Sequence, residues 1–139
     1  MEYTDVDEET NRITGIIVDE GLQVHRTLGP GLYEWVYREC LAKRLRRQSL
    51  KVACEVTFPA FFDGERLDSA FRVDMDIEAK VLVELKAVPL VEPAAFAQLR
   101  TYLRTSGREV GLLMNFHAPR FVDGLYRVRP RAARPPREG

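Results

Sequence analysis

The residues best suited to chemistry lie near the middle of the chain, around the apolar segment Val81-Leu82-Val83-Glu84-Leu85-Lys86. Side chains alternate between the two faces of a β-strand, so Glu84 and Lys86 point the same way. The preceding segment carries Asp74 and Asp76 in the same alternating pattern. If the two segments pair as strands, an aspartate lies beside Glu84 and Lys86. Alternation alone leaves open which of the two aspartates this is.

Such a trio of side chains has two interpretations. Two carboxylates at close range repel each other unless a cation joins them, and hard divalent ions such as Mg²⁺ prefer oxygen ligands. A lysine beside the ion can orient or activate a water molecule, or stabilise developing negative charge. The alternative is an ordinary ion network on a solvated sheet face. From these residues alone, both metal-assisted hydrolysis and a structural role stay open.

Two predicted helices add polar groups to the trio. Glu34 shares a helical stripe with Tyr37 and Leu41, which places a carboxylate in an apolar arc where an unpaired charge is costly. Alternatively, Glu34 lies at the edge of that arc and interacts with the helix amides. Gln98 and Tyr102 are four residues apart and therefore share a helix face, either in a site or as a polar flank. Together these signals favour a functional site.

The elements that must position these residues follow from apolar spacing and from glycine and proline. A helix is expected from Ile13 to Leu28 and a second from Leu32 to about Gln48, separated by Gly29-Pro30-Gly31. A strand is expected within residues 49–62, with Pro59 at a bulge or an edge. After a turn at Asp63-Gly64, the strand Leu67–Ile77 follows, with one face formed by Phe71, Val73, Met75 and Ile77.

The second half of the sequence predicts a strand, then a helix, and then two further strands. The strand Val81–Val88 ends at Pro89, and a helix from Pro93 to about Ser106 is capped by Gly107. The apolar stretch Val110–Phe116 is typical of a strand that is covered on both faces, and Gly124–Val128 is strand-like. The order predicts one α/β domain with a mixed sheet flanked by helices at residues 13–128. Residues 1–12 are expected to be flexible, and the Arg/Pro-rich residues 129–139 to be a disordered tail.

Composition narrows the class of protein. The chain has 139 residues, 45% of them hydrophobic, which suits a single folded domain. No apolar run is long enough to span a bilayer, and the acidic start is unlike a signal peptide. Two cysteines cannot form a disulfide framework or a four-ligand zinc site, so we expect a cytoplasmic protein with reduced thiols. The 21 basic and 21 acidic side chains balance, so nucleic-acid binding would depend on local basic patches.

The segment Gly31-Leu32-Tyr33-Glu34-Trp35-Val36-Tyr37 resembles the signature of the bacterial GxxExxY protein family. That family is similar to the PD-(D/E)XK nuclease superfamily, in the branch with a downstream Gln-x-x-x-Tyr helix. The resemblance covers roughly residues 10–128 and implies a restriction-endonuclease-like core. The other matching segments, in the same order, are Val24-His25-Arg26-Thr27-Leu28-Gly29-Pro30, Arg72-Val73-Asp74, Val83-Glu84-Leu85-Lys86-Ala87, Gln98-Leu99-Arg100-Thr101-Tyr102-Leu103 and Gly111-Leu112-Leu113-Met114-Asn115-Phe116.

The resemblance also implies roles for individual residues. Positions matching Asp74 and Glu84 hold Mg²⁺ or Mn²⁺, helped by the backbone carbonyl that matches Leu85, so the resemblance selects Asp74 over Asp76. The position matching Lys86 assists the attacking water, and the one matching Glu34 completes the metal shell directly or through water. Positions matching Gln98 and Tyr102 support the site or the substrate phosphate.

The implied function is hydrolysis of phosphodiester bonds by a metal-dependent nuclease, with DNA or RNA as the partner. The competing hypothesis is a catalytically silent nuclease-fold module that binds a protein or a nucleic acid. A homodimer is compatible with either function. The sequence leaves open whether the substrate is DNA or RNA, and whether cleavage is endo- or exonucleolytic.

Overall fold

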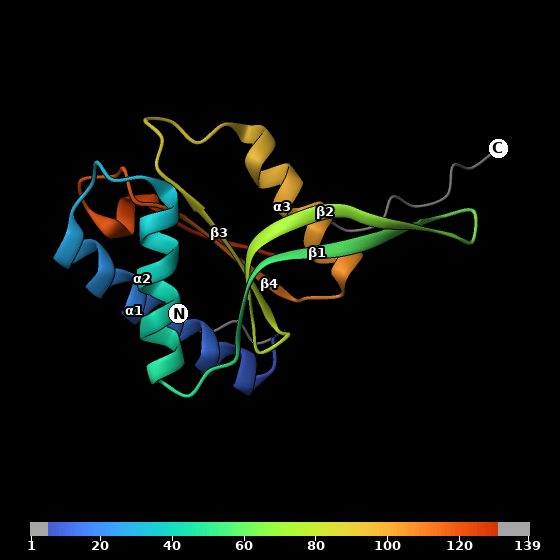
Figure 1. Cartoon of the computed structure of the whole chain (residues 1–139), viewed down its shortest axis with the longest axis horizontal. Coiled ribbons are helices and arrows are strands. Elements are labelled where there is room, and N and C mark those ends of the chain that lie inside the picture. Colours follow the sequence, from blue (N-terminus) through green and yellow to red (C-terminus); the bar gives the residue numbers. More distant parts are fainter. Residues whose placement is uncertain (1–5, 131–139) are drawn as a thin grey trace.

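One mixed sheet of five strands, which lie side by side in the order in which they follow along the chain, organises the fold. The computed structural model describes residues 6–130 (Figure 1). The mixed α/β fold predicted from the sequence is confirmed. The elements are α1 (Glu8–Leu28), α2 (Glu34–Arg47), β1 (Val52–Phe62), β2 (Glu65–Ile77), β3 (Val81–Lys86), α3 (Pro93–Ser106), β4 (Val110–Asn115), the short 3₁₀ helix η1 (Phe121–Gly124) and β5 (Leu125–Val128).

The sheet is antiparallel except at its centre. β1, β2 and β3 form a meander, β3 and β4 run parallel, and β5 returns antiparallel to β4. A parallel pair needs a crossover connection, and α3 provides it between β3 and β4. All six residues of β4 are buried, as predicted for a strand with both faces covered.

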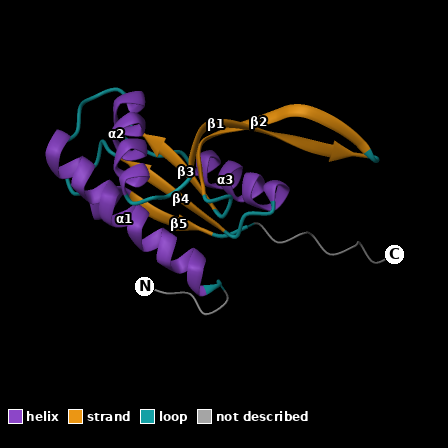
Figure 2. Ribbon diagram, turned by 60° about the horizontal axis from the view of Figure 1, so that its bottom comes forward, coloured by secondary structure: helices purple, strands orange, loops and turns teal. Residues whose placement is uncertain are grey.

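Helices cover the sheet on both sides, with α1 and α2 on one face and α3 on the other (Figure 2). The larger apolar cluster packs α1 and α2 against β3 and β4 through residues such as Ile17, Leu41 and Leu85. The smaller cluster packs α3 against the opposite face through Leu82, Leu99 and Leu113 among others. Each strand of the centre therefore contributes to two cores, which holds the polar residues between them in fixed places.

Several element boundaries differ from the sequence expectation for identifiable reasons. α1 begins at Glu8 rather than Ile13, because the Asp7 side chain accepts a hydrogen bond of 2.7 Å from the Thr10 amide and caps the helix. β3 ends at Lys86, because the Asn115 side chain takes over the hydrogen bonds of the Val88 backbone. Residues 1–5 of the predicted flexible start and 131–139 of the predicted tail lie outside the described residues.

The outer part of β1 and β2 forms a two-stranded arm that projects from the body of the protein (Figure 2). β2 pairs with β3 only over Met75–Ile77, whereas β1 and β2 pair along their whole length. The register of the β1–β2 pair shifts between Phe58 and Ala60, which confirms the bulge expected at Pro59.

The prediction that Phe71, Val73, Met75 and Ile77 share one face of β2 is wrong for the part of the strand that leads from Met75 into the arm. Met75 and Ile77 pack under α1 and α2, but Val73 packs under α3, although strict alternation would place all three on one face. The ladder is interrupted here: Cys54 pairs with Met75 and Val56 with Val73, and Glu55 between them has a positive φ of 52°. The two strands change faces together at this point, because Cys54 of β1 packs with Met75 under α1 and α2, whereas Val56 packs with Val73 under α3.

Within the described part of the chain, no helix is long and apolar enough to cross a membrane.

Candidate active site

The centre of the site is the point where β2 separates from β3. The backbone ladder between the strands ends at the pair Met75–Val83. Beyond it, the Asp74 amide donates a hydrogen bond of 3.0 Å to Oε1 of Glu84, and the Leu85 amide donates one of 2.8 Å to Oδ2 of Asp74. Each carboxylate thus replaces a strand carbonyl as acceptor. The two carboxylates are held side by side, and each keeps a second oxygen for another ligand.

Glu34 is the first residue of α2, so it approaches Asp74 and Glu84 from the face of the sheet that α1 and α2 cover. Tyr37, one helical turn later, fixes that end of the helix. It is fully buried, stacks on Phe116 with ring centroids 4.4 Å apart, and donates a hydrogen bond of 2.6 Å to the Gly29 carbonyl. The Leu32 amide donates a hydrogen bond of 3.1 Å to the same hydroxyl. Tyr37 thus ties Gly29 and Leu32 of the preceding loop to the first turn of α2, where Glu34 lies.

The charges of the site act strongly on one another. Burial and the neighbouring Asp74 charge raise the pKa of Glu84 to about 7, even though the Asp74 amide hydrogen bond and Lys86 lower it. Burial and Asp74 also raise the pKa of Glu34 above its ordinary value, with Lys86 and Arg38 acting in the opposite direction. Three carboxylates therefore share a partly buried space with too little positive charge to offset them.

α3 contributes the remaining two predicted residues. The Glu84 charge lies close enough to Tyr102 to raise the pKa of its phenol, after the larger effect of burial, while a hydrogen bond with Gln98 lowers it. The Tyr102 ring stacks on Phe71 of the arm at 4.2 Å. The structure thus brings the six predicted side chains into one electrostatic neighbourhood: Glu34, Asp74, Glu84, Lys86, Gln98 and Tyr102.

Asp76, the alternative aspartate, lies elsewhere. It is 8% exposed and forms an ion pair of 2.7 Å with Arg108, whose guanidinium also lies over the Phe58 ring. A carboxylate that is buried and paired in this way has a structural role.

Arg38 is a charged residue of this region that the sequence patterns did not single out. It lies one turn after Glu34 on α2, lowers the pKa of Glu34, and forms an ion pair of 3.6 Å with Glu55. Its side chain is only 15% exposed, and its Nε has no hydrogen-bond partner among the described residues. The spacing of four residues from Glu34 was the signal that could have indicated it.

The donor set suits a hard divalent cation, although the residues alone do not enclose one. In the region from residue 6 to 130, no three His, Cys, Asp or Glu side chains are grouped closely enough to hold a metal ion. The paired carboxylates of Asp74 and Glu84 nevertheless offer only oxygen donors, and burial together with the neighbouring Asp74 charge raises the pKa of Glu84 to about 7. A cation with additional water ligands would relieve this repulsion.

One family of known proteins matches most of the chain. A family model described as the PD-(D/E)XK nuclease superfamily matches residues 11–128, a span that includes all six side chains of the site. Among solved structures, the crystal structure of SSO0001 is similar at 16% sequence identity, with a TM-score of 0.42 and coverage of 87% of this chain and 79% of that one. No curated protein matches the chain.

Removal of the Tyr37 hydroxyl should loosen the loop before α2. Tyr37→Phe leaves the Gly29 carbonyl and the Leu32 amide without their partner, so we expect the free energy of unfolding to fall by about 1–2 kcal/mol. Urea denaturation measures this change. Tyr33→Phe is the matched control, because Tyr33 is 79% exposed. Equal stability of Tyr37→Phe and the wild-type protein would contradict the assigned role.

The raised pKa of Glu84 makes stability depend on pH. The folded state binds this proton more tightly than the unfolded state, whose pKa is near 4.5, so metal-free stability should fall as pH rises from about 4.5 to about 7. Glu84→Gln removes the titrating group. At pH 8 in a chelator we expect it to be more stable than the wild-type protein by about 1–3 kcal/mol, with the difference vanishing near pH 4.

Denaturation curves at several pH values test this expectation. The exposed Glu39→Gln is the control, and its difference from the wild-type protein should not change with pH. A Glu84→Gln protein that is less stable than wild type at pH 8 would show that the folded state does not disfavour the charged form of Glu84.

Proposed function

The chain belongs to the PD-(D/E)XK nuclease superfamily, and on that premise we propose that it is a divalent-metal-dependent hydrolase of phosphodiester bonds in DNA or RNA. The observation that supports this most directly is the reciprocal hydrogen bonding of Asp74 and Glu84, which holds two carboxylates together beside Lys86. A balanced ion network would hold carboxylate pKa values down, whereas here burial, followed by the Asp74 charge, raises the pKa values of Glu84 and Glu34. Membership of the GxxExxY branch stays a prediction.

The proposed ligands of Mg²⁺ or Mn²⁺ are the Asp74 and Glu84 carboxylates and the Leu85 carbonyl. Glu34 acts on Glu84 less strongly than Asp74 does, which suits a contact with the ion through water. When bound, the ion supplies positive charge for the phosphate oxygens and lowers the pKa of a bound water.

The remaining groups act on water and on the substrate. Lys86 projects from the same strand as Glu84, so its ammonium can orient the attacking water and stabilise the charge that develops on the phosphate. Arg38 is a further basic group of the same region, and its positive charge suits a phosphate oxygen. We propose that Gln98 and Tyr102 hold the water or the phosphate from the α3 side, where Tyr102 is already fixed by stacking on Phe71.

Cleavage of nucleic acid should depend on the metal and on two side chains. With Mg²⁺ or Mn²⁺, we expect Asp74→Asn and Lys86→Ala to lower the rate by about 100-fold or more, because the first removes a proposed ligand and the second the group that acts on water. The assay uses a panel of single- and double-stranded DNA and RNA. Asp19→Asn and Lys51→Ala, both at exposed positions, are the matched controls.

Two outcomes of this assay would contradict the mechanism. Cleavage that survives in both variants would place the chemistry elsewhere. Folded wild-type protein that binds nucleic acid but cleaves no member of the panel would instead favour the catalytically silent module.

Metal binding should also stabilise the fold, since it occurs only in the folded state. At a Mg²⁺ or Mn²⁺ concentration ten times the dissociation constant, we expect about 1.4 kcal/mol of added stability, seen as a rise in Tm. The rise should be larger at pH 8 than at pH 6, because Glu84 is then deprotonated without help from the ion. An equal rise in the wild-type protein and in Asp74→Asn would locate the ion at another site.

A further inference from the structure

The tip of the β1–β2 arm exposes a group of large apolar side chains. Phe61, Phe62 and Leu67 are 66%, 70% and 51% exposed, although they lie on paired strands far from the body of the protein (Figure 2). Aromatic side chains gathered on a projecting element are typical of a surface that contacts another macromolecule.

The charge of the arm tip indicates which class of macromolecule it can contact. The tip carries Asp63, Glu65 and Asp68 against a single basic residue, Arg66, and Arg66 already forms an ion pair with Asp68. A negative tip repels the phosphates of a nucleic acid. It instead suits a protein surface that combines an apolar hollow with positive charge.

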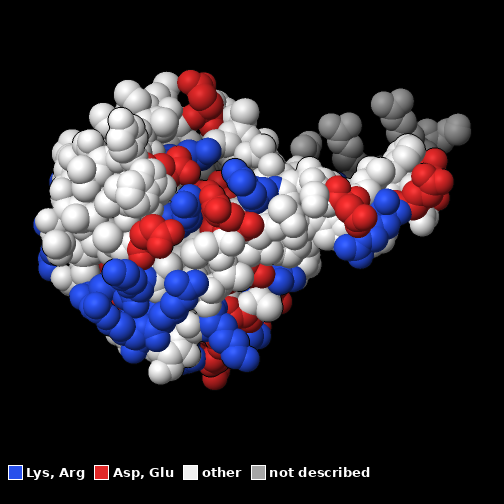
Figure 3. All heavy atoms as spheres, in the orientation of Figure 1, with Lys and Arg blue, Asp and Glu red and all other residues white. Residues whose placement is uncertain are grey.

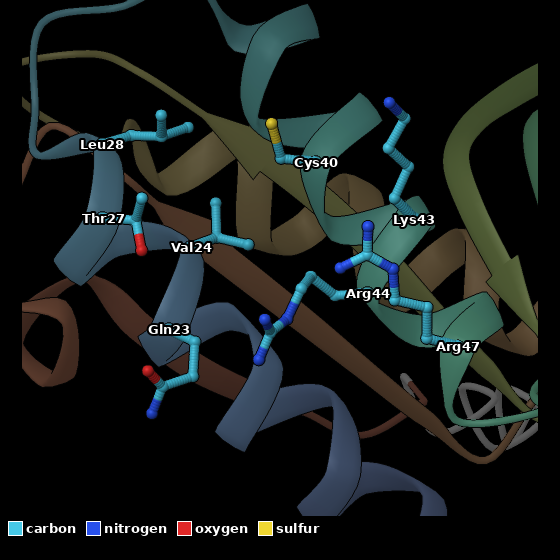
Figure 4. A pocket seen from close by; sticks show the side chains of 8 residues that line it. All are labelled: Gln23, Val24, Thr27, Leu28, Cys40, Lys43, Arg44 and Arg47. Atoms are coloured by element: carbon cyan, nitrogen blue, oxygen red, sulfur yellow. The ribbon is translucent and has the colours of Figure 1, made fainter.

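Such a surface is present on the same chain, in a groove between α1 and α2. The groove has a volume of about 220 Å³, and its apolar part is formed by Val24, Leu28 and Cys40 (Figure 4). Lys43, Arg44 and Arg47 of α2 line one side of it. Arg44 is paired with Glu20, whereas Lys43 and Arg47 are exposed. Lys and Arg form a continuous patch over this half of α2 (Figure 3).

We propose that the arm tip of one copy of this chain binds in the α1–α2 groove of a second copy. Phe62 and Leu67, which lie on one face of the paired strands, would enter the apolar part of the groove, and Asp63 and Glu65 would face Lys43 and Arg47. Both the apolar and the charged parts of the two surfaces are thus complementary. This inference goes beyond the proposed catalytic function and does not depend on it.

The positions of the two surfaces allow a closed dimer. The arm extends from one end of the molecule, and the α1–α2 layer lies at the other (Figure 1). Two copies placed side by side in opposite directions, related by a two-fold axis, bring each arm to the partner's groove. The same contact is then made twice, as in most symmetric dimers.

The oligomeric state in solution tests the proposal. Sedimentation velocity over a range of concentrations should give twice the mass of one chain for the wild-type protein. We expect Phe62→Ser with Leu67→Ser to raise the dimer dissociation constant by roughly 30-fold or more, as expected for central apolar anchors. Leu90→Ser is the matched control, because Leu90 is also exposed, at 71%, but lies outside the arm and the groove.

Charge reversal gives the sharper test. A rim variant, Lys43→Glu with Arg47→Glu, and a tip variant, Asp63→Asn with Glu65→Lys, should each be monomeric alone because like charges then meet. Mixing the two variants should restore a dimer, since each tip again meets a groove of opposite charge. Circular dichroism of each variant checks that the fold is intact.

Each other outcome overturns the proposal. A monomeric wild-type protein, or a dimer that resists the tip and rim variants, shows that this contact is not made. A monomer whose affinity for an oligonucleotide falls in the rim variant alone assigns the groove to nucleic acid. These results are independent of cleavage, so a failure of the dimer and a failure of the nuclease mechanism are distinguishable.

Discussion

The exchange of hydrogen bonds between Asp74 and Glu84 is the interaction on which the site depends. Each side chain accepts an amide of the opposite strand at the point where the backbone ladder stops. Because of this exchange, β2 can separate from β3 without leaving buried amides unpaired, which would cost free energy of folding. It also forces two carboxylates together in a partly buried place. The same contact therefore allows the arm to separate from the sheet and creates the excess of negative charge.

The other elements of the fold hold the Asp74–Glu84 pair in place and position further groups around it. Two apolar layers hold β3 rigidly, Tyr37 fixes the start of α2 so that Glu34 faces the pair, and α3 brings Tyr102 to the opposite side. Lys86 and Arg38 are the basic groups that offset these charges, and the pKa values of Glu84 and Glu34 remain raised in their presence. Burial and repulsion of these carboxylates are the physical basis for proposing a divalent cation, whereas the phosphodiester substrate is proposed from the superfamily match.

Much of this arrangement followed from the sequence because the signals were local. Alternation identified Glu84 and Lys86, and glycine and proline marked the ends of most elements. The choice between Asp74 and Asp76 was not local: it depends on Arg108, which lies far along the chain and pairs with Asp76. The change of face at Val73 of β2 was missed because it accompanies a positive φ at Glu55 of the paired strand β1, where no glycine or asparagine indicates it. Arg38 and the arm-and-groove surfaces likewise required the tertiary structure.

Calorimetric titration of Mn²⁺ into the metal-free protein tests the central claim most directly, because it reports binding without requiring a known substrate. We predict a single binding site in the wild-type protein that is lost in Asp74→Asn and retained in Lys86→Ala, since the lysine is not a ligand and its removal lowers repulsion of the ion. Near pH 6, binding should also release protons, because Glu84 must lose its own to bind the ion. Equal Mn²⁺ affinity in the wild-type protein and Asp74→Asn, or no binding to either, would contradict the account.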